Sequence, residues 1–181
     1  MTSDRREVCR PDGGRPVRTR PNGTASSWRQ MFSGASWRGR DRAILNLEVI
    51  QWHCNNTLNQ YWSAIYELPL GSYAGLYEIV NAYGGKCLDA RNHGTTDRTA
   101  VQQWTCKGTG NQLWAFSIDN AQGEYNIISY PTVEYQSPEV LDVTHSSTGN
   151  GAKIELWHEK GTGMRNGGGN QAWSTVGGWP Y

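Results

Sequence analysis

Five side chains in the middle of the chain have the chemical types that recognise a sugar: Asp89, Gln102, Trp104, Lys107 and Asn111. The apolar C–H face of a sugar stacks on an aromatic ring, and its hydroxyl groups need a few fixed donors and acceptors. An aspartate carboxylate accepts two hydroxyl protons at once, while amides or a lysine supply donors. A hairpin turn between Leu88 and Val101 would bring Asp89 alongside Trp104. The alternative to a sugar site is that Trp104 packs around the core as a structural residue and that Asp89 only caps a turn.

A second set of the same kind lies nearer the C-terminus: Asp142, Trp157, Lys160 and Asn170. Glu155 stands here in place of an amide, and Val140 and Glu159 stand where the first set has cysteines. The additional carboxylate, together with a longer loop, leaves two alternatives open, namely a changed ligand preference or no binding.

Both sets belong to an internal repeat, which has to be recognised before local structure is assigned. Segments 49–62, 101–114 and 154–173 align, and each ends in Asn, Gln, a variable residue and Trp. The closing tryptophans stand at 62, 114 and 173. The third copy is longer because it has extra residues in the Gly/Asn-rich stretch 164–169. Lengthening a loop there has little entropic cost. Three copies, at about 44–70, 76–122 and 124–178, therefore form one domain over 44–178.

The first copy departs from the other two at its N-terminal side. A Leu-Asp pair precedes the central tryptophan of copies two and three, whereas none precedes Trp52. Met31 or a neighbour falls where the aspartate belongs. The first copy keeps Trp52, Asn55 and Asn59, but without the aspartate Trp52 is expected to be structural.

The composition favours turn-rich β-structure. The chain has 22 Gly and 9 Trp against 2 Phe, and 18% of its residues are charged. Short alternating stretches at 77–80 and 125–128 predict strands, and no helical period is visible. These features predict an all-β fold built from three similar units. No apolar stretch approaches the ~20 residues that span a bilayer, so no membrane span is expected.

Segment 1–43 has a different composition. Residues 1–42 contain ten Arg and four acidic residues, whereas the net charge of the whole chain is +1. This Arg/Gly/Ser-rich segment has no periodicity and is expected to be disordered or to result from a misassigned start. A basic tail could touch nucleic acid, but solvated disorder is favoured, and no nucleic-acid partner is expected.

The threefold pattern resembles the ricin B-type β-trefoil lectins, also classed as carbohydrate-binding module family 13. The resemblance is carried by 60–62, 112–114 and 171–173, which read Gln-x-Trp, and by Cys-Leu-Asp at 87–89 and Gln-Gln-Trp-Thr-Cys at 102–106. It implies a β-trefoil of three Gln-x-Trp repeats, the first incomplete at its N-terminal side. Trp62, Trp114 and Trp173 would be buried around its threefold axis.

The resemblance also implies roles for the two sets. Asp89 would accept hydroxyls and Trp104 would stack, while Gln102, Lys107 and Asn111 would support them. The partner would be a mono-, oligo- or polysaccharide of galactose or xylan type, bound without catalysis and without a cofactor. Two alternatives remain, namely an accessory module of a secreted glycoside hydrolase and a protein-binding or inhibitory trefoil. A glycosidase needs two carboxyls about 5–10 Å apart, whereas each of the two sets offers one aspartate on a binding loop.

The resemblance pairs Cys87 with Cys106 in a disulfide, which favours an oxidising, extracellular location although no signal peptide is visible. Cys54 lacks its expected partner near residue 35, and Cys9 is a doubtful substitute. His53 beside Cys54 has no two further ligands at useful spacing, so no metal site is expected.

Overall fold

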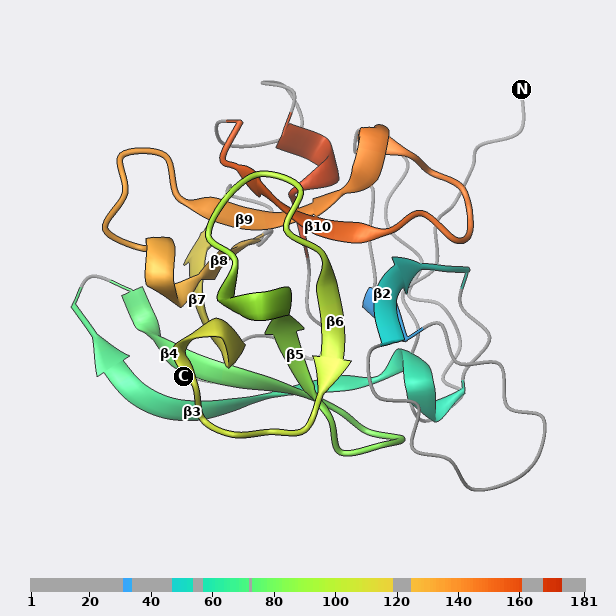
Figure 1. The fold of residues 1–181 in the computed structure, drawn as a ribbon, viewed down its shortest axis with the longest axis horizontal. Coiled ribbons are helices and arrows are strands. Elements are labelled where there is room, and N and C mark those ends of the chain that lie inside the picture. The colour runs from blue at the N-terminus through green and yellow to red at the C-terminus, as the bar shows by residue number, and fades with distance from the viewer. Residues whose placement is uncertain are drawn as a thin grey trace, which may run out of the picture.

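The structure, a computed structural model, describes residues 31–33, 47–53, 57–71, 73–118, 125–160 and 168–173. Within these ranges the chain forms antiparallel strands joined by short 3-10 turns (Figure 1). The strands are β1 (Met31–Ser33), β2 (Leu47–Gln51), β3 (Trp62–Leu70), β4 (Tyr73–Asn81), β5 (Cys87–Ala90), β6 (Val101–Trp104), β7 (Leu113–Ile118), β8 (Tyr125–Ser129), β9 (Glu139–Val143) and β10 (Ile154–His158). The 3-10 turns are η1 (Leu58–Gln60), η2 (Arg91–His93), η3 (Gly110–Gln112), η4 (Tyr130–Thr132), η5 (Thr144–Ser146) and η7 (Gly168–Asn170). No helix among these residues is long and apolar enough to cross a membrane.

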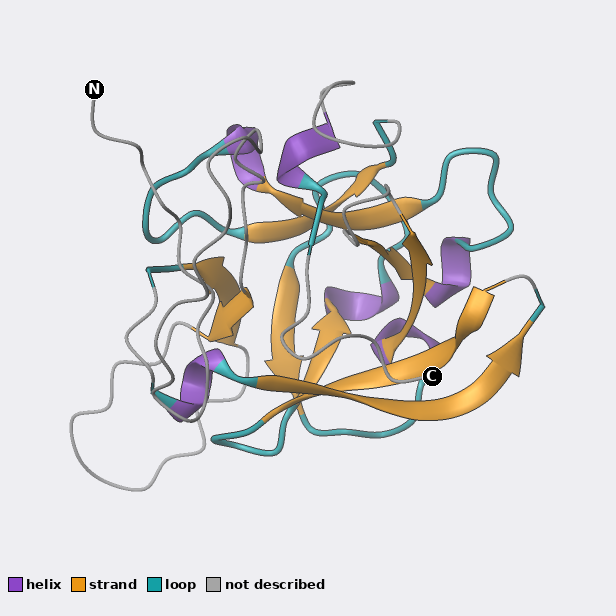
Figure 2. Ribbon diagram, turned by 180° about the vertical axis from the view of Figure 1, so that it is seen from behind, coloured by secondary structure: helices purple, strands orange, loops and turns teal. Residues whose placement is uncertain are grey.

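The strands pair in the order β1-β2-β6-β5-β4-β7-β8-β9-β10, with β3 added beside β4. The long β3–β4 pair runs along the lower side of the molecule from both directions of view (Figure 1, Figure 2). The pairs β1–β2, β5–β6 and β9–β10 occupy corresponding places in the three repeats. The predicted hairpin after Leu88 is confirmed, since β5 and β6 pair with each other.

Strand β1 lies inside segment 1–43, for which the sequence predicts no regular structure. That prediction is wrong at residues 31–33, because their backbone pairs with β2 over 49–51. The register places Phe32 opposite Ile50, as Asp89 lies opposite Gln102 in repeat two. Repeat one therefore has Phe32 at the register position that Asp89 holds in repeat two.

Two of the three closing tryptophans are core residues. Trp114 is fully buried and Trp173 is 3% exposed, and they pack with apolar residues of all three repeats. Their indole N–H groups donate to the carbonyl oxygens of Leu88 at 3.1 Å and Leu141 at 3.0 Å, which satisfies the one polar atom of each ring. Trp62 is only half-buried against this core, contrary to expectation, because among the described strands β3 pairs with β4 alone and lies at the edge of the sheet.

Neighbouring repeats are joined by a contact that recurs at two seams. The backbone N–H of His158 in repeat three donates to Asp97 Oδ1 of repeat two at 2.7 Å, and that of His53 in repeat one donates to Asn150 Oδ1 of repeat three at 2.6 Å. The following residues, Arg98 and Gly151, have positive φ values of 66° and 85°. Their N–H groups bond to the neighbouring repeat at 2.8 Å in both cases. Each loop thus completes the strand end of another repeat.

The predicted disulfide between Cys87 and Cys106 is present and ties the start of β5 to the loop after β6. Cys9 and Cys54 lie outside the described residues, as does Asn55. The bridge closes a loop with a sequence separation of 19 residues inside repeat two. It therefore restrains the part of the chain that carries Asp89, Gln102 and Trp104.

The variant Cys87→Ala/Cys106→Ala should unfold more easily than the unmodified protein. Removing a cross-link over a loop of this length raises the entropy of the unfolded chain and costs roughly 3 kcal/mol. Urea titration at 25 °C, followed by circular dichroism, measures the difference in free energy of unfolding. A variant as stable as the parent would contradict a stabilising role for the bridge.

Candidate functional site

The carboxylate of Asp89 is the centre of a buried polar network in repeat two. Asp89 is 4% exposed; its Oδ1 accepts a hydrogen bond from Gln102 Nε2 at 2.9 Å. Its Oδ2 accepts one from Asn111 Nδ2 and one from Gln112 Nε2, both at 2.9 Å. A carboxylate has about four lone-pair positions, so these three donors leave about one on Oδ1 for a ligand hydroxyl. Asp89 can therefore accept a hydrogen bond from one ligand hydroxyl, rather than from the two that the sequence led us to expect.

Trp104 lies on the same face of the β5–β6 hairpin as Asp89. The register pairs Asp89 with Gln102 and Cys87 with Trp104, and residues two apart on a strand share a face. The Trp104 ring is half-buried. Lys107 does not join this network, because its side chain is exposed and its ammonium group makes no hydrogen bond or ion pair with any described residue. Repeat two thus brings together a carboxylate, two amides and an aromatic ring.

Gln112 is a network residue that sequence reasoning missed, because it treated the Gln-x-Trp motif as core packing. It is fully buried, and its amide joins Asp89 to the next loop by donating to Thr105 O at 3.0 Å and accepting from Lys107 N at 2.7 Å. Gln171 does the same in repeat three through Asp142, His158 O and Lys160 N. The recurrence of this glutamine in the sequence is the signal that could have found it.

Arg91 is a second missed residue. Its Nε donates to Gln102 Oε1 at 2.9 Å, which orients the amide so that Nε2 points to Asp89. Glu48 lies opposite Gln102 on β2 and faces Arg91 at 4.0 Å and Lys153 Nζ at 2.8 Å. No feature of repeat two alone predicts this support, because Glu48 and Lys153 come from the other two repeats.

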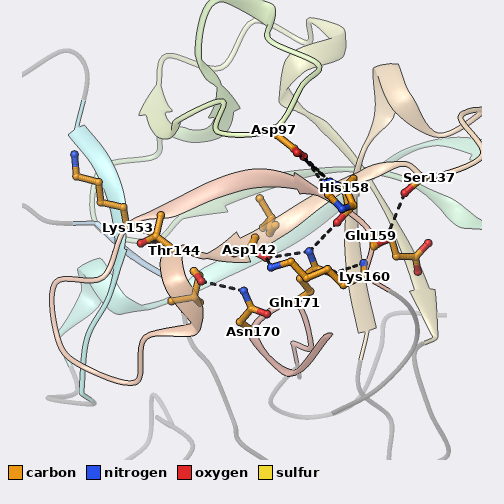
Figure 3. A network of polar contacts seen from close by, with 12 residues as sticks. Asp97, Ser137, Asp142, Thr144, Lys153, His158, Glu159, Lys160, Asn170 and Gln171 are labelled. Atoms are coloured by element: carbon orange, nitrogen blue, oxygen red, sulfur yellow. Dashed lines mark hydrogen bonds and ion pairs between the residues drawn. The ribbon is translucent and has the colours of Figure 1, made fainter. Parts of the chain in front are cut away.

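Repeat three arranges its corresponding residues differently (Figure 3). Asp142 is 1% exposed, and its Oδ2 accepts from Gln171 Nε2 at 2.9 Å and from Lys160 Nζ at 2.8 Å. The same ammonium group lies 5.3 Å from the centroid of the Trp157 ring, and the Arg98 guanidinium lies 5.7 Å from it. Three of the four predicted residues, Asp142, Trp157 and Lys160, are therefore in contact.

Asn170 does not join them, because its amide donates to the carbonyl oxygen of Val143 at 3.0 Å instead. Its Oδ1 is buried without a hydrogen-bond partner among the described residues. In repeat two the Thr109 hydroxyl donates to Asn111 Oδ1 at 2.8 Å, whereas repeat three has Gly168 at that place. The loss of a single hydroxyl accounts for the unpaired oxygen.

Glu155 stands opposite Asp142, where repeat two has Gln102 opposite Asp89. Burial and the nearby charge of Asp142 raise the pKa of Glu155 above its ordinary value. An ionised glutamate cannot donate to Asp142 as the amide of Gln102 donates to Asp89. The exchange of one amide for a carboxylate is the main chemical difference between the two sites.

Repeat one lacks the polar pair altogether, since Phe32 and Ile50 occupy the two register positions. Trp52 is nevertheless 40% exposed, so it is a surface ring rather than the structural residue that the sequence predicts. Its position at the end of β2, where the strand reaches solvent, explains the difference. Asn59 bonds to the Thr57 hydroxyl at 2.5 Å, within the closing turn.

The model of the family described as ricin-type beta-trefoil lectin domain-like matches residues 58–157. The chain belongs to this family. The all-β trefoil fold and the family predicted from the sequence are confirmed. No curated protein sequence matches the chain.

Solved structures of similar fold include natural and designed proteins. The designed threefold-symmetric protein ThreeFoil is 30% identical, with a TM-score of 0.59 over 73% of this chain and 82% of its own. An exo-β-1,3-galactanase from Clostridium thermocellum is 31% identical, with a TM-score of 0.57 over 72% of this chain and 24% of its own. A Polyporus squamosus lectin, 20% identical with a TM-score of 0.51 over 81% of this chain and 47% of its own, shares the fold alone.

A second polar cluster of this ricin-type trefoil lies at the seam between repeats two and three. Glu139 on β9 is 7% exposed and pairs in register with His158, whose ring bonds to Asp97 at 3.0 Å. Burial and the charge of Asp97 raise the pKa of Glu139 to about 7. Burial would also raise the pKa of Asp97, but hydrogen bonds from the backbone and ring of His158 outweigh it and lower that pKa.

The raised pKa of Glu139 predicts that this lectin-like domain loses stability as the pH rises. The folded chain holds the proton up to about pH 7, whereas the unfolded chain releases it near the ordinary value of 4.5. The free energy of unfolding should therefore decrease between these two pH values, by on the order of 3 kcal/mol, and then level off. Urea unfolding of the unmodified protein and of Glu139→Gln, at pH 4.5 and pH 8, measures this decrease.

Glu139→Gln stays neutral throughout and should lose less stability over the same range. Other groups titrate in both proteins, so the difference between the two losses isolates Glu139. Equal losses in the two proteins would contradict the assignment.

Proposed function

We propose that this trefoil binds carbohydrate without catalysis, through Asp89 and Trp104 of repeat two. The observation that carries the proposal is the oriented carboxylate of Asp89 beside a half-buried indole ring on the same hairpin face. Membership of a lectin-like family supports carbohydrate binding in general. The geometry of the hairpin supports the choice of Asp89 and Trp104.

Each group in repeat two has a defined part in recognition. The free lone pair on Asp89 Oδ1 accepts a ligand hydroxyl, and the Trp104 ring stacks against the apolar face of the sugar. Gln102 and Asn111 hold the carboxylate in place, so little side-chain freedom is lost when a ligand binds. Lys107 is exposed in the following loop and lies outside this set.

The ligand class that we propose is a mono-, oligo- or polysaccharide of galactose or xylan type. The galactanase, whose structure resembles this chain over only 24% of its own length, supports a galactose-containing glycan and a place as an accessory module of a secreted glycoside hydrolase. A single shallow site gives affinities near the millimolar scale, about −4 kcal/mol. The Cys87–Cys106 bridge supports an extracellular location.

The carboxylates around Asp89 and Asp142 support binding without catalysis. Hydrolysis of a glycosidic bond needs two of them, one as acid and one as base or nucleophile. Asp89 faces the amide of Gln102 rather than a second carboxylate. Asp142 does face Glu155, but it is 1% exposed and its charge is neutralised by Lys160.

Trp104→Ala should weaken saccharide binding at least about tenfold, because a stacked aromatic ring contributes about 1.5 kcal/mol. Isothermal titration with galactose, lactose and soluble xylan measures the affinity, and circular dichroism checks the fold.

Asp89→Asn should weaken saccharide binding as well, since the amide keeps the shape of the carboxylate but loses an acceptor oxygen. The same titrations measure this loss of affinity.

Trp52→Ala is the matched control, because it removes an equally placed ring from a repeat without the aspartate. It should leave the affinity unchanged. A folded parent protein that binds none of the three saccharides would overturn the proposal in favour of a protein-binding or inhibitory trefoil.

A further inference from the structure

The ammonium group of Lys160 lies between the two groups of repeat three that correspond to Asp89 and Trp104. It is 2.8 Å from Asp142 Oδ2 and 5.3 Å from the centroid of the Trp157 ring. A sugar that used this site would need the same ring face and the same carboxylate edge. Lys107 holds the corresponding place in repeat two, where its backbone N–H bonds to Gln112 as that of Lys160 bonds to Gln171. Only Lys160, of these two lysines, turns back onto its own repeat.

The cause is visible in the residues that lie side by side across three strands. In repeat two the row is Glu48, Gln102 and Asp89, so an amide separates two carboxylates and donates to one of them. In repeat three the row is Ala100, Glu155 and Asp142. Two carboxylates then face each other directly, which is unfavourable unless a cation neutralises them. Lys160 supplies a cation to Asp142, at 2.8 Å from its Oδ2.

We propose that Lys160 occupies the third-repeat site in place of a ligand, and that Glu155 keeps it there. This inference rests on the proposed function of repeat two, since it assumes that the shared geometry is a sugar site. The ammonium group satisfies the carboxylate and covers the ring, so a neutral saccharide has to displace an ion pair whose carboxylate is nearly buried. Weak stacking and hydroxyl contacts do not compensate for that loss.

The double variant Glu155→Gln/Lys160→Ala should open the site. The amide introduced by Glu155→Gln would donate to Asp142 as Gln102 donates to Asp89, and the Trp157 ring would be uncovered on the side of Lys160. Made together with Trp104→Ala, which disables repeat two, the double variant should restore saturable binding of the saccharide that the parent binds. Isothermal titration of the triple variant against Trp104→Ala alone is the measurement.

The matched control is Lys107→Ala in the Trp104→Ala background, which removes an exposed lysine from the corresponding place and should restore nothing. Strong binding by Trp104→Ala alone, lost on adding Trp157→Ala, would overturn the proposal because the third site would already be open. A folded triple variant that binds no more than Trp104→Ala would also overturn it.

A second measurement needs no sugar. Lysine acetylation by a soluble active ester, followed by peptide mass spectrometry, should modify Lys160 several-fold more slowly than Lys107, because its ammonium group must first leave the ion pair. Glu155→Gln should speed the reaction of Lys160 and leave that of Lys107 unchanged. If Lys160 is protected but the parent binds no saccharide, the proposed function fails while the closed arrangement stands. Equal reactivity of the two lysines would overturn the closed arrangement itself.

Discussion

A glutamine amide hydrogen-bonded to a nearly buried aspartate carboxylate is the interaction on which the functional part of this protein depends. A carboxylate removed from water is costly unless donors surround it. Gln112 and Gln171 provide such a donor at 2.9 Å and bond, with their remaining atoms, to the loop that follows the hairpin. The aspartate, the hairpin and the loop are therefore fixed by one side chain. The closing tryptophan, two residues after the glutamine, donates from the core side to the carbonyl oxygen of the residue that precedes the aspartate.

Because the glutamine–aspartate contact lies within a single repeat, the residues at the paired register positions can differ between repeats without loss of the common fold. Repeat one has an apolar pair at the two key register positions, repeat two an aspartate with an amide, and repeat three two carboxylates. The backbone register is the same in all three. The repeated scaffold thus carries three different residue pairs at one register position, and the chemistry there depends on side chains rather than on the fold.

The sequence predicted most of what repeats along the chain. The constant step from the Leu-Asp pair to the central tryptophan placed Asp89 and Trp104 on one hairpin, and the disulfide followed from the family resemblance. It could not predict contacts between repeats, since those depend on how the copies close against one another. Glu48 of repeat one supports Gln102 through Arg91, and Ala100 of repeat two pairs with Glu155 of repeat three. The partial exposure of Trp62 depends on β3 being a sheet edge, which no local pattern reveals.

The seams between the repeats have a consequence for how such a chain can be assembled. Asp97 completes the strand end at His158, and Asn150 completes the one at His53, always with a loop from one repeat and a strand end from another. A unit that carries both such a loop and such a strand end has the two halves of a head-to-tail interface. Three identical units of this kind would close into a ring with cyclic symmetry, without any linker. In this respect the covalent chain is equivalent to a homotrimer whose subunits have been joined end to end.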